Sequence, residues 1–133
     1  MPRTSESRFR VRYAETDQMG VVYYANYFVW MEIGRTDFCK YSGFSYRDLE
    51  KEENAFIAVV EATCRYLAPA RYDEEITVTT TLARSSRRVV EFTYTIQNQK
   101  DLLAEGKTLH VVVGRDGRPR SMPDRYFELL QGG

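Results

Sequence analysis

The sequence predicts an α+β fold in which one long central helix is wrapped by a curved antiparallel sheet of about five strands. Three observations lead to this fold class. An alternating strand pattern opens the chain, a helical pattern follows at residues 24–42, and from about residue 56 apolar side chains recur at every second position. Four strands in a row without an intervening helix favour an antiparallel meander over a doubly wound parallel sheet.

The first strand and the long helix each carry a clear period. Phe9, Val11 and Tyr13 alternate with arginines, which is typical of a half-buried strand, and the polar segment 1–7 before it is expected to be disordered. The apolar face of the helix consists of residues three or four positions apart: Tyr27, Met31, Gly34, Phe38 and Tyr41. We expect Gly34 to allow close packing on the sheet, and Gly43 to end the helix.

The later elements follow from periodicity and turn residues. Turns are predicted at 98–101 and at Asp116-Gly117, and Pro123 is expected at the first position of the last helix. The remaining predicted elements are a short helix at 46–53, strands at 56–67, 76–82, 90–96 and 103–114, and a helix at 124–130.

Composition limits the functional classes. The chain has 133 residues, which fits one domain over 1–133, and 19 basic residues balance 19 acidic ones. A zero net charge argues against non-specific nucleic-acid binding, which needs a strongly positive surface. No apolar run reaches the length of a membrane span, and no apolar signal core is present, so a cytoplasmic location is expected.

Serine, cysteine and metal chemistry are not favoured. None of the seven serines lies in a GxSxG motif, and the single histidine, His110, lies in a Val-rich strand where a packed structural residue is expected. Cys39 and Cys64 form no CxxC pair and are expected to be reduced packing thiols. No HExxH, P-loop or GxGxxG motif is present. The sequence therefore predicts neither a metal site nor a bound cofactor.

Asp17 has the best chemical setting among the acids. It lies in a loop that Gly20 closes, shortly before a helix N-terminus, where backbone N–H groups lack partners. A carboxylate facing such donors can attack or hydrolyse an acyl group while the donors stabilise the oxyanion. The same residues, with Thr16, also fit a plain turn or helix cap.

Three other acids rank below Asp17. Glu15 and Glu32 have neighbours that fit solvent-facing positions. Glu61 lies in an apolar strand, where an acid must pair, face solvent or titrate at raised pH, and it is a possible second acid of the site.

Two blocks of the sequence resemble the 4-hydroxybenzoyl-CoA thioesterase family of hotdog-fold proteins. The first is TDQMGVVYYANYFVWMEIGRTDF, which combines an acid, a glycine, an aromatic pair and Asn-Tyr at fixed spacing, and the second is VVEATCRYLAPARYDEEITVTTTL. The resemblance covers roughly residues 8–127. It implies an acyl-CoA thioesterase, an enzyme that hydrolyses the thioester to free acid and CoA.

The resemblance also implies roles for residues of the first block. Asp17 matches the catalytic aspartate, which attacks the thioester carbonyl or activates water as a general base, and both routes stay open. The backbone N–H of Tyr24 would polarise the carbonyl, with Gly20 and Val22 shaping the approach. Tyr23 and Tyr27 belong to an aromatic-rich neighbourhood that would line an acyl or aryl pocket.

The resemblance further implies a CoA site and an oligomer. CoA belongs to the substrate, so no separate cofactor is expected, and its phosphates would need cations at the pocket mouth. The strand connection around residue 86 offers these groups: Arg84, Ser86, Arg87 and Arg88. Hotdog subunits pair edge to edge, which implies a homodimer and often a homotetramer, and the strand Thr77–Leu82 is compatible with a covered edge.

Three other functions remain. The carrier could be acyl-carrier protein instead of CoA. A hotdog hydratase or dehydratase would need a histidine beside its acid, and His110 is far from Asp17 in sequence. A non-catalytic acyl-CoA binding module would retain the pocket and would keep its function after Asp17→Asn.

Overall fold

The computed structural model describes residues 3–132, which fold around one five-stranded antiparallel sheet. The strand order is β1-β3-β4-β5-β2, and every neighbouring pair is antiparallel. The elements are β1 (Thr4–Arg10), η1 (Tyr13–Glu15), α1 (Asn26–Ser42), α2 (Tyr46–Glu53), β2 (Phe56–Tyr66), β3 (Glu75–Ser85), β4 (Val89–Gln97), β5 (Leu102–Val113) and α3 (Asp124–Gln131).

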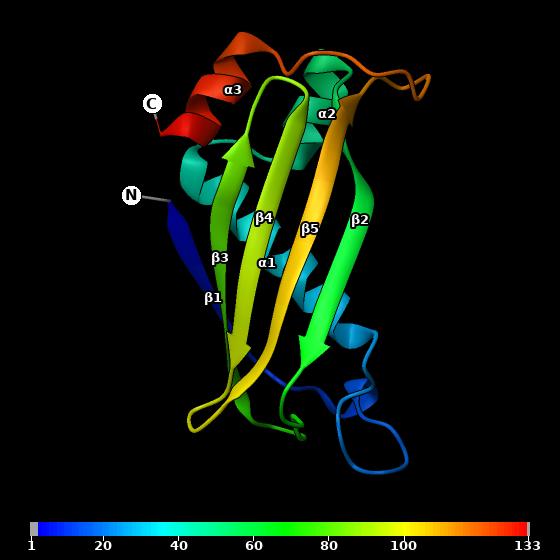
Figure 1. Ribbon diagram of the computed structural model, residues 1–133, viewed down its shortest axis with the longest axis vertical. Helices are drawn as coiled ribbons and strands as arrows, with labels where there is room; N and C mark the ends of the chain where they lie inside the picture. The colour runs from blue at the N-terminus through cyan, green and yellow to red at the C-terminus, as the bar shows by residue number, and fades with distance from the viewer. Residues whose placement is uncertain (1–2, 133) are drawn as a thin grey trace.

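Helix α1 lies across one face of this sheet, and Figure 1 shows it running behind the strands. Trp30, Met31 and Phe38 of α1 are fully buried against sheet residues such as Ile76 and Phe92. Register shifts in the β2–β5, β3–β4 and β4–β5 pairs bend the strands. The predicted α+β fold, with one long helix and a curved sheet of about five strands, is confirmed.

Gly34 brings α1 close to β3, as the sequence predicts. A Cβ atom at this position would collide with the hydroxyl of Thr80 and lie 3.0 Å from Cγ1 of Val78. Only glycine fits this contact without a shift of the helix or the strand.

The first strand begins earlier than expected. Residues 4–7 were predicted to be disordered, but β1 starts at Thr4 and pairs with β3 from Thr4↔Thr81 onward. Arg3 also donates to the carbonyl oxygens of Leu129 and Leu130, at 2.9 and 2.6 Å. Polar side chains do not prevent pairing on an edge strand because the ladder uses backbone groups. Residues 1–2 of the predicted segment lie outside the described residues.

Two helix starts differ slightly from prediction. Helix α1 begins at Asn26 instead of Tyr24, because residues 23–25 form a tight turn before the regular helix. Pro123 is the N-cap of α3 and not its first helical residue. The predicted helix end at Gly43 is confirmed, with a φ of 110° that suits glycine. None of the helices in residues 3–132 is long and apolar enough to cross a membrane.

The sheet edges are β1 and β2. The prediction that Thr77–Leu82 forms a covered edge is wrong, because β3 lies between β1 and β4. The alternating β-branched residues reflect a central strand with one buried face. On β2, by contrast, Val59 and Val60 are about half exposed.

Candidate active site

The Asp17 loop is a small closed hairpin at the lower end of the sheet in Figure 1, before the start of α1. Its two sides pair step by step: Tyr23 N donates to Glu15 O (2.9 Å), Thr16 bridges Val22, and Asp17 N donates to Val21 O (2.8 Å). Gly20 adopts a φ of 82° at the tip, a conformation that glycine accepts readily.

The connection between β2 and β3 anchors this loop. Val22 N donates to the carbonyl of Ala70 (2.9 Å), and Val21 bridges Arg71. The two sequence blocks therefore meet here, through residues that are about 50 positions apart in the chain. The second block thus supports the loop of the first.

The Asp17 carboxylate is half-buried and only partly engaged. Its Oδ1 accepts from the backbone N–H of Met19 (2.8 Å) and from that of Val21 (3.4 Å), an Asx-type turn that fixes the side chain. Within residues 3–132, no hydrogen bond reaches Oδ2. One oxygen is therefore fixed by the loop, and the other can act on a bound molecule.

Two backbone donors lie open at the start of α1. Asn26 N donates to Tyr23 O (2.9 Å) and Tyr27 N to Tyr24 O (3.2 Å), whereas the N–H groups of Tyr24 and Ala25 have no acceptor within the described chain. The positive end of the helix dipole adds to these donors. Such a pair can hold a developing negative charge on a carbonyl oxygen.

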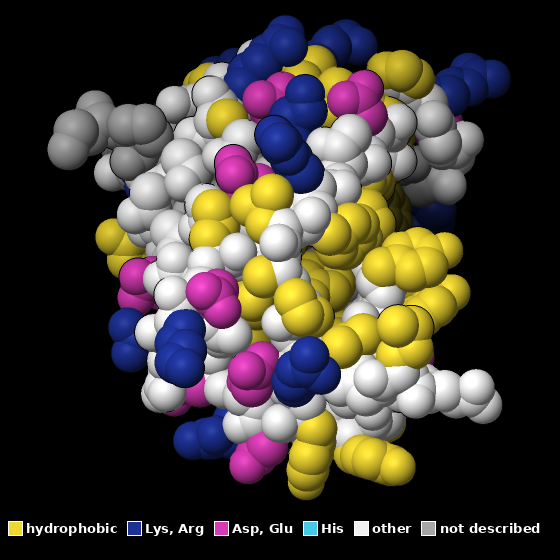
Figure 2. All heavy atoms as spheres, turned by 60° about the horizontal axis from the view of Figure 1, so that its bottom comes forward, with side chains coloured by type: hydrophobic (Ala, Val, Ile, Leu, Met, Phe, Trp, Pro, Cys, Tyr) yellow, Lys and Arg dark blue, Asp and Glu magenta, His cyan; other side chains and the backbone are white. Residues whose placement is uncertain are grey.

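An apolar cleft of about 340 Å³ lies beside these donors. In Figure 2 the lower end of the view in Figure 1 comes forward, and hydrophobic side chains gather around a hollow on one side. The cleft is lined by Val22, Tyr24, Tyr27, Tyr66, Ala68 and Pro69.

The cleft walls include residues that the sequence singled out and one that it did not. Val22 and Tyr27 line the cleft, while Tyr23 lies outside the lining and packs on the ring of Tyr24 (4.8 Å between centroids). Tyr66 was not predicted, although it stands in the second block. Its hydroxyl donates to Tyr24 O (3.0 Å), and burial raises the pKa of Tyr66, so this donor stays protonated.

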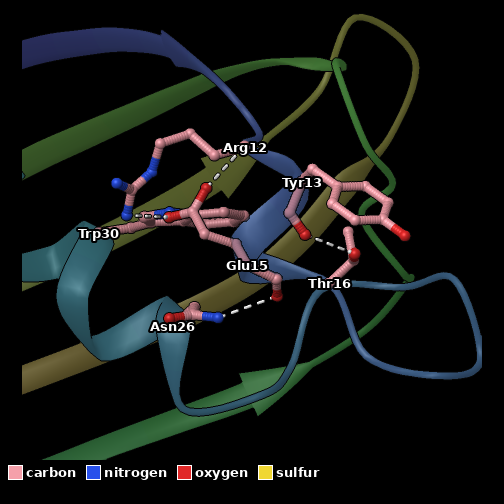
Figure 3. A network of polar contacts seen from close by, with 6 residues as sticks. All are labelled: Arg12, Tyr13, Glu15, Thr16, Asn26 and Trp30. Carbon is pink, nitrogen blue, oxygen red and sulfur yellow. Dashed lines mark hydrogen bonds and ion pairs between the residues drawn. The ribbon is translucent and has the colours of Figure 1, made fainter.

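Glu15 corrects an expectation, because it is buried instead of facing solvent, with 5% exposure. Figure 3 shows its carboxylate between Arg12 and Trp30. Oε1 accepts from Arg12 N (2.8 Å) and Oε2 from Trp30 Nε1 (2.9 Å), with the Arg12 guanidinium 3.5 Å from Oε2. The sequence pattern could not reveal this contact, since Trp30 is 15 residues away.

The predicted phosphate-binding residues lie far from the Asp17 loop in the folded chain. The connection between β3 and β4 is at the end of the sheet opposite the Asp17 loop, as Figure 1 shows. Arg87 pairs there with Asp124 and stacks over Phe127 (4.5 Å), and Ser86 Oγ accepts from Val89 N (3.1 Å). Arg84 and Arg88 are exposed, and within residues 3–132 neither forms an ion pair.

The other predicted groups are separate from the loop. Glu61 faces solvent on β2 and pairs with Lys107 at 3.7 Å. His110 is fully buried, and Nε2 lies 2.8 Å from Thr108 Oγ1. Burial lowers the pKa of His110 to about 4 and raises that of the Cys39 thiol to about 12, so both are neutral near pH 7. The expectation that His110 and Cys39 are packing residues is confirmed.

The described residues contain no cluster of three or more His, Cys, Asp or Glu side chains placed to hold a metal ion. The chemical groups at the loop are thus a carboxylate, two open N–H donors and an apolar cleft. On a long helix wrapped by a five-stranded antiparallel sheet, they define the class of hotdog-fold thioesterases.

Comparison with known proteins gives the family. The profile of the thioesterase-like superfamily matches residues 11–129, and the chain belongs to this superfamily. The putative acyl-CoA thioesterase YneP of Bacillus subtilis is 39% identical over 113 residues, covering 84% of this chain and 81% of YneP.

Two further relatives agree with this assignment. The acyl-CoA thioester hydrolase YbgC of Escherichia coli is 36% identical over 86% of each chain. The crystal structure of a DHNA-CoA thioesterase from Staphylococcus aureus matches with a TM-score of 0.87 and 35% identity, covering 94% of this chain and 84% of that one.

Proposed function

We propose that the chain is an acyl-CoA thioesterase that hydrolyses an acyl-CoA to the free acid and CoA, with Asp17 as its acid. The observation that carries this proposal is the half-exposed carboxylate on a loop whose other side leads directly to the open N–H groups of Tyr24 and Ala25. Relatives named acyl-CoA thioesterases support the reaction class.

Two routes fit this arrangement. In the first, Asp17 attacks the thioester carbonyl, the C–S bond breaks, and water then hydrolyses the mixed anhydride. In the second, Asp17 takes a proton from water as the water attacks the carbonyl. In both, the Tyr24 N–H stabilises the oxyanion, the CoA sulfur leaves and takes up a proton, and the acid departs. Water is the only reactant in these steps besides the substrate and the protein.

The cleft is the proposed acyl site. Val22 and Tyr27 form an apolar wall next to the Tyr24 backbone, and Gly20, with a φ of 82°, shapes the tip of the loop that carries Asp17. Tyr23 backs the ring of Tyr24 and would act on the shape of the pocket through that contact.

A homodimer would complete the site, and a homotetramer is the proposed assembly. The β2 edge has unpaired backbone groups and two half-exposed valines, Val59 and Val60, which a second β2 would cover. A twofold axis through β2 makes the two sheets continuous in antiparallel sense. This arrangement brings the end of one subunit that carries the Asp17 loop toward the end of the other that carries the β3–β4 connection.

In such a dimer, the arginines of the β3–β4 connection of one subunit would bind the phosphates of a CoA whose acyl group lies in the cleft of the other subunit. Arg88 and Arg84 are the exposed candidates, while Arg87 and Ser86 already hold α3 and the turn. Both cysteines are unpaired thiols, which fits a reducing compartment such as the cytoplasm.

A thiol-release assay tests the reaction. The purified protein is given CoA esters of C2 to C16 fatty acids, benzoate and 4-hydroxybenzoate. We expect turnover on at least one of them, and the best ester then identifies the acyl class. Absence of turnover on every ester, with CoA binding retained, would overturn the proposal and favour a binding module; hydrolysis of acyl-carrier-protein substrates alone would favour that carrier.

A further inference from the structure

Glu15 connects the segment before the Asp17 loop to the helix that follows it. Its carboxylate accepts from the backbone of Arg12 on one side and from the indole of Trp30 in α1 on the other. The acid is almost completely buried, while the guanidinium of Arg12 beside it reaches solvent. A buried carboxylate with donors on both oxygens is rigid, because each bond lost would leave a charged group unsatisfied.

The backbone carbonyl of Glu15 forms the other half of this connection. It accepts from Tyr23 N (2.9 Å) and from the side-chain amide of Asn26 (2.9 Å), the latter drawn in Figure 3. Asn26 N in turn donates to Tyr23 O (2.9 Å). Glu15, Tyr23 and Asn26 therefore form a closed ring of hydrogen bonds.

This ring fixes the orientation of one peptide group. The carbonyl of Tyr23 and the N–H of Tyr24 belong to the same planar trans peptide, so they point in opposite directions. Because the Tyr23 carbonyl is held by Asn26, the Tyr24 N–H must point away from the helix interior. Asp17 lies two residues after Glu15, on the side of the closed loop that pairs with residues 21–23.

We propose that Glu15 is a positioning residue that fixes the Asp17 carboxylate and the Tyr24 N–H relative to each other, through the contacts with Arg12, Trp30, Tyr23 and Asn26. The inference rests on the proposed function. Glu15 itself does not touch the reacting atoms. Small errors in the placement of reacting groups lower a catalytic rate strongly, whereas binding of the distant CoA nucleotide does not depend on them.

The variant Glu15→Gln tests this role. The amide keeps the shape of the side chain but presents an NH2 group to a donor, so either Arg12 N or Trp30 Nε1 loses its acceptor. We expect kcat to fall roughly 10- to 100-fold, with KM for the acyl-CoA changed less than about 3-fold. The matched control is Glu6→Gln, an exposed acid of β1 that pairs with Arg8, which should keep the parental kcat.

A second variant keeps the test decisive if Glu15→Gln does not fold. Asn26→Ala removes only the amide that donates to Glu15 O, and we expect a kcat loss of roughly 10-fold with KM retained. In a double variant with Asp17→Asn, the effect of either substitution should be much smaller than in the parent, because the acid it positions is gone.

The outcomes separate this inference from the proposed function. Folded Glu15→Gln or Asn26→Ala with parental kcat, or with losses that multiply fully with Asp17→Asn, would overturn the positioning role even if Asp17→Asn is inactive. An Asp17→Asn protein with parental activity would instead overturn the proposed function, and the positioning role with it.

Discussion

Glu15 and Asp17 are two acids two residues apart with different surroundings. Glu15 is buried with both oxygens bonded, whereas Asp17 is half-exposed with one oxygen open. The environment, more than the residue type, decides which carboxylate is available for chemistry.

The sequence alone singles out Asp17 as a candidate acid but gives no sign of the buried position of Glu15. The glycine, the aromatic pair and the following helix stand next to Asp17 in the chain, so its setting is local. Glu15 depends on Trp30 and Asn26, which reach it only after α1 folds back over the loop. For the same reason the sequence did not point to Tyr66, whose contact with Tyr24 joins the end of β2 to the helix start.

The two neighbouring arginines of the β3–β4 connection should respond differently to substitution. Arg88→Ala is expected to raise KM for a CoA ester at least about 5-fold, with little change for a thioester that lacks the nucleotide, because only the phosphates are affected. Arg87→Ala should lower the melting temperature, since it loses Asp124 and Phe127. Steady-state kinetics on both substrates, with thermal melts, decide; equal effects of Arg88→Ala on both substrates would remove it from the site.

The predicted elements agree with the structure in type and order, because each carries its own period. The β2–β5 region, the short helix Tyr46–Glu53 and the turns at 98–101 and 116–117 were all readable from local patterns. The predicted first residues of elements were less accurate where backbone hydrogen bonds, and not the side-chain pattern, determine the boundary, as at Thr4 of β1 and Asn26 of α1.

Gly34 gives a prediction for the contact between α1 and β3. Gly34→Ala should lower the free energy of unfolding by about 1–3 kcal/mol despite the better helix propensity of alanine, because its Cβ would collide with Thr80. Urea unfolding measures the change. Adding Thr80→Ala should recover part of the loss, and a stabilised single variant would show that the helix shifts without cost.

The order of strands was beyond prediction from the sequence. Periodicity identifies strands but not their neighbours, so the pattern of the threonine-rich β3 is compatible with an edge strand although β3 lies inside the sheet. The separation of the Asp17 loop from the Arg84–Arg88 connection could not be predicted for the same reason. Sheet order decides which loops share an end of the molecule.

The exposed β2 edge predicts self-association. Sedimentation should find the protein as a dimer or a tetramer, and Val60→Lys should raise the dimer dissociation constant at least about tenfold by placing a charge on the covered edge. Thr95→Lys, on the exposed face of the central strand β4, is the matched control. A monomeric parent, or equal effects of both substitutions, would rule out pairing through β2.

Buried His110 predicts a pH dependence of global stability. Its folded pKa of about 4 lies below the unfolded value of 6.5, so the unfolded chain binds the proton more readily. The contribution is complete above pH 6.5 and is lost as the pH falls toward 4, by up to about 3 kcal/mol. Chemical unfolding of the parent and of His110→Gln should diverge in this range; parallel curves would contradict the assignment.

The most direct test of the proposed active site is kcat for thiol release by Asp17→Asn on the best acyl-CoA ester, with substrate binding measured beside it. We expect kcat to fall at least ~100-fold while the substrate still binds, as for a positioned acid–base group. Asp101→Asn, an exposed acid of the β4–β5 turn, is the control that should keep parental activity. Asp17→Asn turnover within a few-fold of the parent would contradict the role of Asp17.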